Sequence, residues 1–474
     1  MSASESGPDF VKAIGRLDAT ALVVGSMIGS GIFIVAADIM RQVGSPGLLL
    51  TVWLVSGAVT LLGALTYGEL AAMFPRAGGQ YVYLREGISP LFGYLYGWTL
   101  FTVIQTGTIA AVAVAFARFT AVFLPGLSEN VFLGGVVRLP SGSIQIGLSH
   151  QRLLAVASVL LLTWVNIRGV RTAAHIQTSL TVIKAASLIA LIGLGLSLGL
   201  RDGALIANFR NGFLPPGGLH AGLLPLIGAA MVGSLFSMDA WNNVGFAAAE
   251  LNEPKRDLPF AMAAGVLLVT TLYFLANLAY VAVLPADQIA NAPQDRVATA
   301  AMQAMLGDTG LYLMAAAIIV STFGCNNGLI LSGARVYYAM ARDGLFFSKT
   351  GTLDARHRTP VVALVLQAVW TCVLCLSGTY SQLLDYVIFA AVLFYMLTVV
   401  GLFILRVKRP DADRPVRAPG YPWLPGAYLL LTGAICVNLL AEKPQYTWPG
   451  LIIVALGVPV YLLWRGLGKK RGHA

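Results

Sequence analysis

Charged side chains are scarce in this sequence, since Asp, Glu, Lys and Arg make up only 11% of its 474 residues. A water-soluble domain carries about 25% charged residues, because polar groups must cover its surface. Here 57% of the residues are hydrophobic and the mean hydropathy is +0.77. These proportions exclude a water-soluble protein of this length and indicate that lipid surrounds much of the chain.

Cysteine is also scarce, and metal-binding patterns are missing. The four cysteines lie in apolar segments, and the C-x-x-C pair of Cys372 and Cys375 has no second pair of ligands in any loop. We therefore expect no metal and no cofactor, and we interpret this pair as small packing residues. The N-terminus lacks the basic region and short apolar core of a cleavable signal.

Long polar linkers are absent between the apolar segments, so we expect one helical bundle. A spanning helix needs about 20 mainly apolar residues. Twelve segments meet this need, near 18–41, 46–73, 90–124, 151–168, 174–200, 221–250, 258–284, 309–341, 360–378, 382–406, 421–441 and 447–465. The domains predicted from them are a tail at 1–17, a helical core at 18–406, two further helices within 407–466 and a tail at 467–474.

The net charge of +10 would suit a nucleic-acid-binding protein, but its placement indicates membrane topology instead. If the N-terminus is cytoplasmic, 22 of the 31 Lys and Arg residues lie on the inner side, and two, Arg118 and Lys184, lie within spans. Cytoplasmic loops carry an excess of basic residues. We therefore predict a multi-pass protein of the cell inner (plasma) membrane with both termini in the cytoplasm and no nucleic-acid partner.

The first predicted span is interrupted by glycine. Gly25, Gly29 and Gly31 fall within seven residues near its middle, together with Ser26 and Ser30. Glycine weakens a helix by about 1 kcal/mol relative to alanine, and the backbone groups that a break frees must find partners inside the protein. A stripe of small residues for close helix packing is the alternative interpretation.

The sixth predicted span carries the matching interruption. Ser237, Asp239, Asn242 and Asn243 interrupt its apolar run, and a carboxylate in mid-membrane is costly. This span stands five spans after the first, so ten spans divide into two runs of five. Because each run has an odd number of spans, the second run has the opposite orientation in the membrane. Interrupted helices at corresponding positions of inverted halves indicate a transporter binding site. The predicted fold is therefore an all-α membrane protein of twelve helices, with a five-plus-five inverted repeat, broken helices 1 and 6, and two C-terminal helices.

The two breaks together suit a zwitterion. The half-helix beginning at Gly29–Gly31 presents N–H groups and a positive dipole end, which favour a carboxylate. Carbonyl groups freed at Met27, Phe236 and Asp239 suit an ammonium group. We therefore predict an α-amino acid as the substrate.

Four segments then carry a family resemblance. GSMIGSGIF at 25–33, YGELAAMFPRAGGQYVYLREG at 67–87, WNNVGFAAAELNEPKRDLP at 241–259 and GARVYYAMARDGLFF at 333–347 resemble motifs of the amino acid–polyamine–organocation superfamily, in particular of L-type amino acid transporters. The resemblance implies sodium-independent exchange of L-amino acids by alternating access, and no enzyme activity. The alternatives are a proton-coupled symporter of amino acids or polyamines, and a transporter-like amino acid sensor.

The resemblance also implies residue roles. Backbone amides of the first break would bind the substrate carboxylate, and carbonyls of both breaks its ammonium, with the Phe236 ring as an outer gate. For Asp239 only the backbone role carries over, since its side chain either caps a half-helix or contacts the substrate. The implied substrate-binding residues are Met27, Ile28, Gly29, Ser30, Gly31, Phe236, Ser237, Asp239 and Asn327.

One lysine within a span bears on ion coupling. Lys184 lies about ten residues into the fifth span, so it must be paired or extend to the membrane surface. The resemblance implies that its ammonium occupies the place where sodium binds in sodium-coupled relatives, between the first break and helix 8, near Ser321 and Thr322.

Other residues receive simpler interpretations. Glu69 and Arg76 border the end of the second span and are predicted to pair with each other. Animal relatives are linked by a disulfide to a heavy chain through the loop after helix 3, but the corresponding loop at 125–150 contains no cysteine. We therefore expect a monomer with no disulfide-linked heavy chain, whose partners are its substrate and the lipid bilayer. A channel filter and an intramembrane catalytic grouping are not evident in the sequence.

Overall fold

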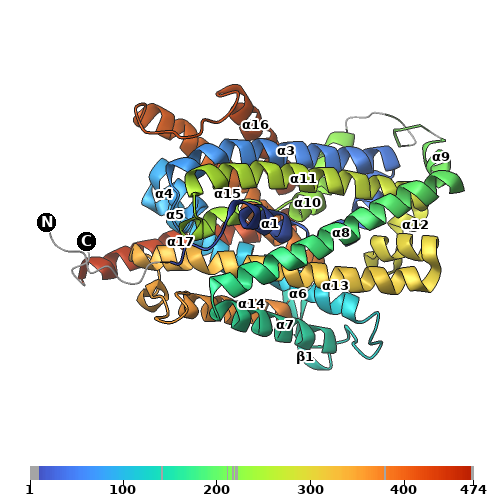
Figure 1. Ribbon diagram of the computed structural model, residues 1–474, viewed down its shortest axis with the longest axis horizontal. Coiled ribbons are helices and arrows are strands. Elements are labelled where there is room, and N and C mark those ends of the chain that lie inside the picture. Colours follow the sequence, from blue (N-terminus) through green and yellow to red (C-terminus); the bar gives the residue numbers. More distant parts are fainter. Residues whose placement is uncertain are drawn as a thin grey trace.

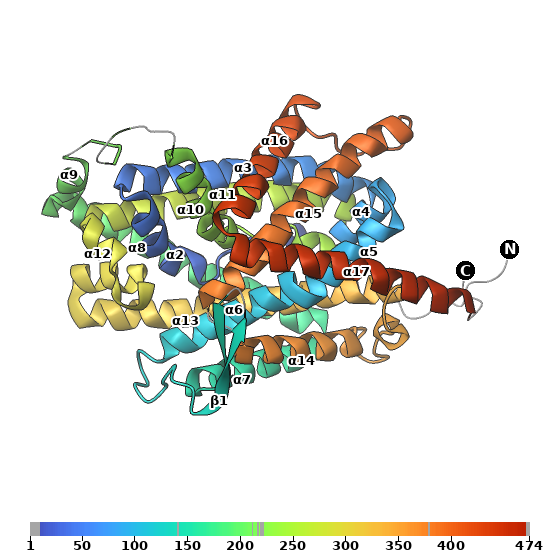
Figure 2. The same cartoon turned by 180° about the vertical axis from the view of Figure 1, so that it is seen from behind.

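The computed structural model describes residues 10–139, 142–210, 212–215, 218, 222–377 and 380–470. Helices dominate this part of the chain (Figures 1 and 2), which confirms the predicted helical membrane fold. An exception to the all-α prediction is an antiparallel hairpin of β1 (Leu133–Leu139) and β2 (Gly142–Leu148), within the segment predicted as a loop.

The first half of the chain forms two half-helices and a series of long helices. The elements are α1 (Arg16–Met27), α2 (Gly31–Val43), α3 (Pro46–Met73), α4 (Gln80–Gly87), α5 (Pro90–Thr99), the π-helical turn η1 (Leu100–Ile104), α6 (Gln105–Thr120), α7 (His150–Ile167) and α8 (Val170–Asp202). The helix α4 is short and lies at one end of the bundle (Figure 1).

The second half repeats the pattern of a broken span followed by long helices. Its elements are α9 (Ala204–Phe209), α10 (Leu223–Ser237), the 3-10 segment η2 (Asn243–Glu250), α11 (Pro254–Val283), α12 (Ala286–Ala290), η3 (Pro293–Asp295), α13 (Val297–Arg342), η4 (Ser348–Gly351), α14 (Val361–Ser377) and α15 (Tyr380–Lys408). Two C-terminal helices follow, α16 (Trp423–Glu442) and α17 (Pro444–Lys470).

The number of membrane crossings is tested by helix length and hydropathy. Within the described ranges, nine helices are long and apolar enough to cross a membrane, and the bent pair of α1 and α2 makes ten. The helices α10 and α14 are apolar but shorter, with 15 and 17 residues. The count of twelve therefore stays a prediction, which requires both shorter helices to complete a crossing.

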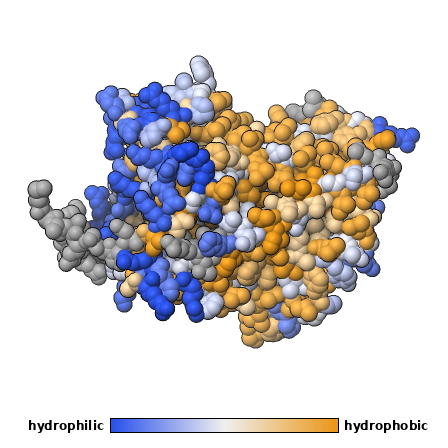
Figure 3. All heavy atoms as spheres, viewed as in Figure 1, coloured by the Kyte–Doolittle hydropathy of each residue, from blue (hydrophilic) through white to orange (hydrophobic). Residues whose placement is uncertain are grey.

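One end of the molecule is hydrophilic, and an apolar band follows it (Figure 3). The C-terminal part of α17 extends toward this end, and α4 lies there as well (Figure 1). Exposed basic side chains at the ends of α13 and α15 and in η4 are Arg342, Lys408 and Lys349. We call this the hydrophilic end.

Both predicted interruptions are present. The helices α1 and α2 meet at a bend of 40° across residues 28–30. The second break separates α10 from η2, and it contains Ala240 with a φ of 68°, a left-handed conformation that non-glycine residues seldom adopt. Both breaks lie within the bundle, because α10 packs against α2 while α8 and α13 pack against α1.

Candidate substrate site

A pocket lies where the two breaks face each other. Residues of the first break that line it are Ser26, Met27, Gly29, Ser30 and Gly31, and those of the second are Phe236, Ser237, Asp239 and Ala240. Thr108 and Val112 of α6 and Cys325 of α13 complete the wall. All predicted site residues except Ile28 and Asn327 thus lie together.

One end of the pocket is the N-terminus of α2. This helix begins at Gly31, so its first N–H groups have no acceptor within the helix, and the positive end of its dipole faces the break. The predicted donor Gly29 is placed differently, because its N–H donates to the Met27 carbonyl at 2.8 Å. The start of α2 is therefore the end of the pocket at which the backbone favours an anion.

The carbonyl groups near the breaks are partly occupied. The Met27 carbonyl accepts a hydrogen bond from the Tyr273 hydroxyl at 2.8 Å as well as from Gly29. The Phe236 carbonyl accepts from the Asp239 N–H at 3.1 Å. The Met238 N–H also reaches the Phe236 carbonyl, so the Phe236 and Met27 carbonyls each have two donors for their two lone pairs in this conformation.

Lys184 lies on the other side of the first break. Its Nζ donates to the carbonyls of Gly25 at 2.7 Å, Ile28 at 2.9 Å and Ser321 at 3.2 Å. The side chain is 1% exposed, so it does not extend to the membrane surface. Ile28, predicted as a substrate ligand, instead directs its carbonyl to Lys184 and to the Ser321 hydroxyl at 3.1 Å.

The Asp239 side chain does not cap a half-helix. Its carboxylate accepts a hydrogen bond from the Tyr395 hydroxyl of α15 at 2.5 Å. Asp239 also lines a second, small cavity, on whose wall Thr60, Tyr395 and Tyr428 lie. The carboxylate therefore stands between the pocket and this second cavity.

Asn327 is placed outside the pocket. Its amide donates to the Ala173 carbonyl and to the Gln177 side chain, both at 3.1 Å, and its oxygen accepts from Asn166 at 3.0 Å. These contacts join α13 to α7 and α8. The prediction that Asn327 lines the pocket is wrong for this conformation, because interhelical partners satisfy the side chain.

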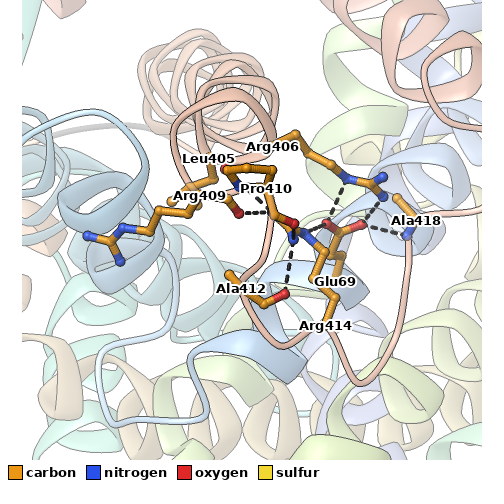
Figure 4. A network of polar contacts seen from close by, with 8 residues as sticks. All are labelled: Glu69, Leu405, Arg406, Arg409, Pro410, Ala412, Arg414 and Ala418. Atoms are coloured by element: carbon orange, nitrogen blue, oxygen red, sulfur yellow. Dashed lines mark hydrogen bonds and ion pairs between the residues drawn. The ribbon is translucent and has the colours of Figure 1, made fainter.

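Glu69 does not pair with Arg76 as predicted. Figure 4 shows its carboxylate between Arg406, in the last turn of α15, and Arg414, in the segment that follows α15. Arg406 donates to it at 2.9 and 2.5 Å, Arg414 at 3.0 Å, and the Ala418 N–H at 2.8 Å. Glu69 is completely buried, and two guanidinium groups compensate its charge better than one nearby exposed arginine.

Sequence reasoning missed several residues around the pocket. Tyr273 and Tyr395 hold the breaks through their hydroxyl groups, and Thr108 and Cys325 line the wall. A tyrosine in the middle of a membrane span is a usable signal, since its hydroxyl needs a partner there.

Comparisons with known proteins agree with this geometry. The family model described as amino acid permease matches residues 14–463. The large neutral amino acids transporter small subunit 2 of Mus musculus is 33% identical, covering 98% of this chain and 82% of its own. The Asc-type amino acid transporter 1 of Homo sapiens is 31% identical, covering 97% of this chain and 84% of its own. The b(0,+)-type amino acid transporter 1 of Mus musculus is 29% identical, covering 96% of this chain and 88% of its own. The chain belongs to the amino acid permease family, and it is a membrane transporter of amino acids.

Proposed function

We propose that this transporter exchanges L-amino acids across the membrane by alternating access without sodium. The observation that carries the proposal is the position of the Lys184 ammonium between the carbonyls of Gly25, Ile28 and Ser321. A ring of carbonyl groups is a typical cation site. A fixed ammonium there fills it and repels a second cation strongly in a medium of low dielectric constant.

The substrate pose follows from the pocket. We place the substrate carboxylate at the start of α2, against the N–H groups of Ser30 and Gly31, where the helix dipole is positive. We place its ammonium toward the carbonyls of Phe236 and Asp239. Ser237 and the Phe236 ring lie beside this position, so they would contact the side chain or cover the bound molecule.

Alternating access also has a structural basis. Each break separates a half-helix from the rest of its span, so the halves can tilt without unfolding a continuous helix. The pocket is enclosed in this conformation, with Phe236 only 6% exposed. Opening toward either side requires the half-helices to separate from the neighbouring helices.

The test is counterflow with purified protein in liposomes. Vesicles loaded with unlabelled amino acids should accumulate labelled amino acid from outside, equally in sodium and in choline buffers, while empty vesicles should accumulate little. Binding without any movement would identify a sensor instead. Stimulation by sodium would overturn the assigned role of Lys184.

The remaining assignments belong to the same proposal. The core at 18–406 performs transport, and the helices within 407–466 pack outside it, flanked by tails at 1–17 and 467–474. The hydrophilic end faces the cytoplasm of a cell whose plasma membrane holds the protein. We propose a monomer without a covalent heavy chain, since the segment 125–150 contains no cysteine.

A further inference from the structure

Asp239 is a buried carboxylate without a cationic partner. Its side chain lies within the bundle, and the residue is 7% exposed. Among the described residues, no Lys, Arg or His side chain forms an ion pair with it. An isolated ionised carboxylate in such a place is costly. In contrast, the buried Glu69 and Glu250 each pair with arginine.

The titratable groups around Asp239 are neutral at ordinary pH. They are Tyr96 of α5, Cys325 of α13, Tyr395 of α15 and Tyr428 of α16. Phenols and thiols titrate above neutral pH in water, and only their ionised forms carry a charge. None of these side chains can therefore balance an Asp239 charge, and its donors among the described residues, the Tyr395 hydroxyl and the Ala240 N–H, are both neutral.

A chain of hydrogen bonds leads from Asp239 to the hydrophilic end. Tyr395 Oη lies 2.5 Å from Asp239 Oδ1 and 3.3 Å from Asn242 Oδ1. The Asn242 amide donates to the Gln80 oxygen at 2.6 Å, and the Gln80 amide donates to the Thr398 hydroxyl at 3.0 Å. All four partners after Asp239 are buried. From Asn242 onward each side chain donates a hydrogen bond to the next one in the chain, from Asn242 to Gln80 and from Gln80 to Thr398.

Tyr395 has one hydroxyl proton and two acceptors within reach. When Asp239 is ionised, this proton must go to the carboxylate, and Asn242 loses the Tyr395 donor. When Asp239 is protonated, its own O–H donates to Tyr395 Oη, and the Tyr395 proton is released for Asn242. The direction of one hydroxyl thus depends on the protonation of Asp239.

The end of this chain lies where two segments meet closely. Gln80 begins α4, and the preceding Gly79 packs against the backbone of Gly245 in η2, where an added Cβ would lie 2.7 Å from the Gly245 carbonyl carbon. The bond between Asn242 and Gln80 therefore ties the second broken span to α4. Losing the Tyr395 donor would weaken this tie.

We propose that Asp239 binds and releases a proton during the transport cycle, and that Tyr395 transmits this event to the contact between Asn242 and Gln80. The proton comes from water in the open pocket, resides on Asp239 while the pocket is closed toward the hydrophilic end, and returns to water when that side opens. Asp239 is the proton site, and Tyr395 is a positioning residue. This inference goes beyond exchange, which requires no proton.

The experiment measures counterflow in liposomes at equal internal and external pH, from about pH 5 to about pH 9. We expect the native exchange rate to change at least threefold across this range. Asp239→Asn keeps a side-chain donor for Tyr395 and cannot titrate, so its rate, whatever its level, should not vary with pH. Tyr428→Phe, on the wall of the second cavity, is the matched control and should keep the native profile.

Infrared difference spectra between acid and alkaline pH provide a readout independent of transport. The native protein should lose the C=O band of a neutral carboxylic acid as the pH rises, and Asp239→Asn should lack that band. Tyr395→Phe should keep the band while its exchange rate loses the pH dependence, because the proton still binds but is no longer transmitted.

The outcomes separate this inference from the proposed function. A native exchange rate that does not vary with pH, or a native pH profile in Asp239→Asn, overturns the proton site while leaving exchange intact. A native pH profile in Tyr395→Phe overturns the role of the hydroxyl. Absence of counterflow at every pH refutes exchange, and the infrared band would still decide whether Asp239 binds a proton.

Discussion

Replacing Gly31 by alanine should separate the two half-helices that form the pocket. A Cβ at Gly31 would lie 2.8 Å from the Cβ and 3.0 Å from the Cα of Ser237, and it would overlap the Ser237 hydroxyl. Carbon atoms in contact prefer about 3.5–4.0 Å. The start of α2 must therefore move away from α10, and with it the N–H groups that we assign to the substrate carboxylate.

The size of the effect follows from overpacking. Inserting a methyl group into a packed site costs about 1–3 kcal/mol. If the cost falls on the closed, substrate-bound conformation, affinity should decrease by a factor between about 5 and about 150. The double variant with Ser237→Gly removes the overlapping hydroxyl and Cβ, so it should recover most of the lost affinity.

The assay is binding of labelled amino acids to purified protein in detergent, with thermal unfolding measured alongside. Gly193→Ala is the matched control, because an added Cβ there has no atom within 4 Å, and it should bind as the native protein does. Native affinity in a well-folded Gly31→Ala would refute the contact argument. Failure of Ser237→Gly to restore binding would show that the loss has another cause.

Three further predictions concern other parts of the chain. Lys184→Met should reduce turnover at least about tenfold, because three buried carbonyls lose a charged donor; an active variant, measured by counterflow, would contradict this. Glu69→Gln should lower the free energy of unfolding by about 3–5 kcal/mol, because Arg406 and Arg414 lose their buried charged partner. The control Glu129→Gln replaces an exposed carboxylate and should change the free energy of unfolding by less than about 1 kcal/mol. Equal shifts in the thermal unfolding of the two variants would refute this difference. The native protein purified from membranes should migrate as one chain without reductant, and a disulfide-linked partner would contradict the prediction made from the cysteine-free segment 125–150.

The breaks could be predicted from the sequence because their signals are local. Glycines grouped within a few residues weaken a helix wherever they stand, and Asp239 in an apolar run is costly in any arrangement of helices. The structure places the bend at residues 28–30 and ends α10 at Ser237, as these signals indicate.

The partners of the breaks could not be predicted in the same way. Tyr273 is 246 positions from the Met27 carbonyl to which it donates, and Tyr395 is 156 positions from Asp239. The position of each tyrosine within a span indicates that its hydroxyl needs a partner, but nothing in the local sequence indicates which distant group that partner is. Asn327 and Glu69 illustrate the same limit. The resemblance implied a pocket position for Asn327, but its side chain bonds to Gln177 of another helix. Proximity in sequence suggested Arg76 as the partner of Glu69, but the fold brings the distant Arg406 to it.

The contacts that hold the first break lie largely on the side away from the pocket. Lys184 binds Gly25 and Ile28 from α8, and Tyr273 binds Met27 from α11. These donors satisfy the carbonyls at the end of α1 without a ligand, so the break can persist in the empty carrier. The N–H groups at the start of α2 face the pocket instead. This division explains how one interruption can be stable between transport events and still bind substrate, because the fold satisfies its carbonyl end while its amide end remains directed toward the ligand.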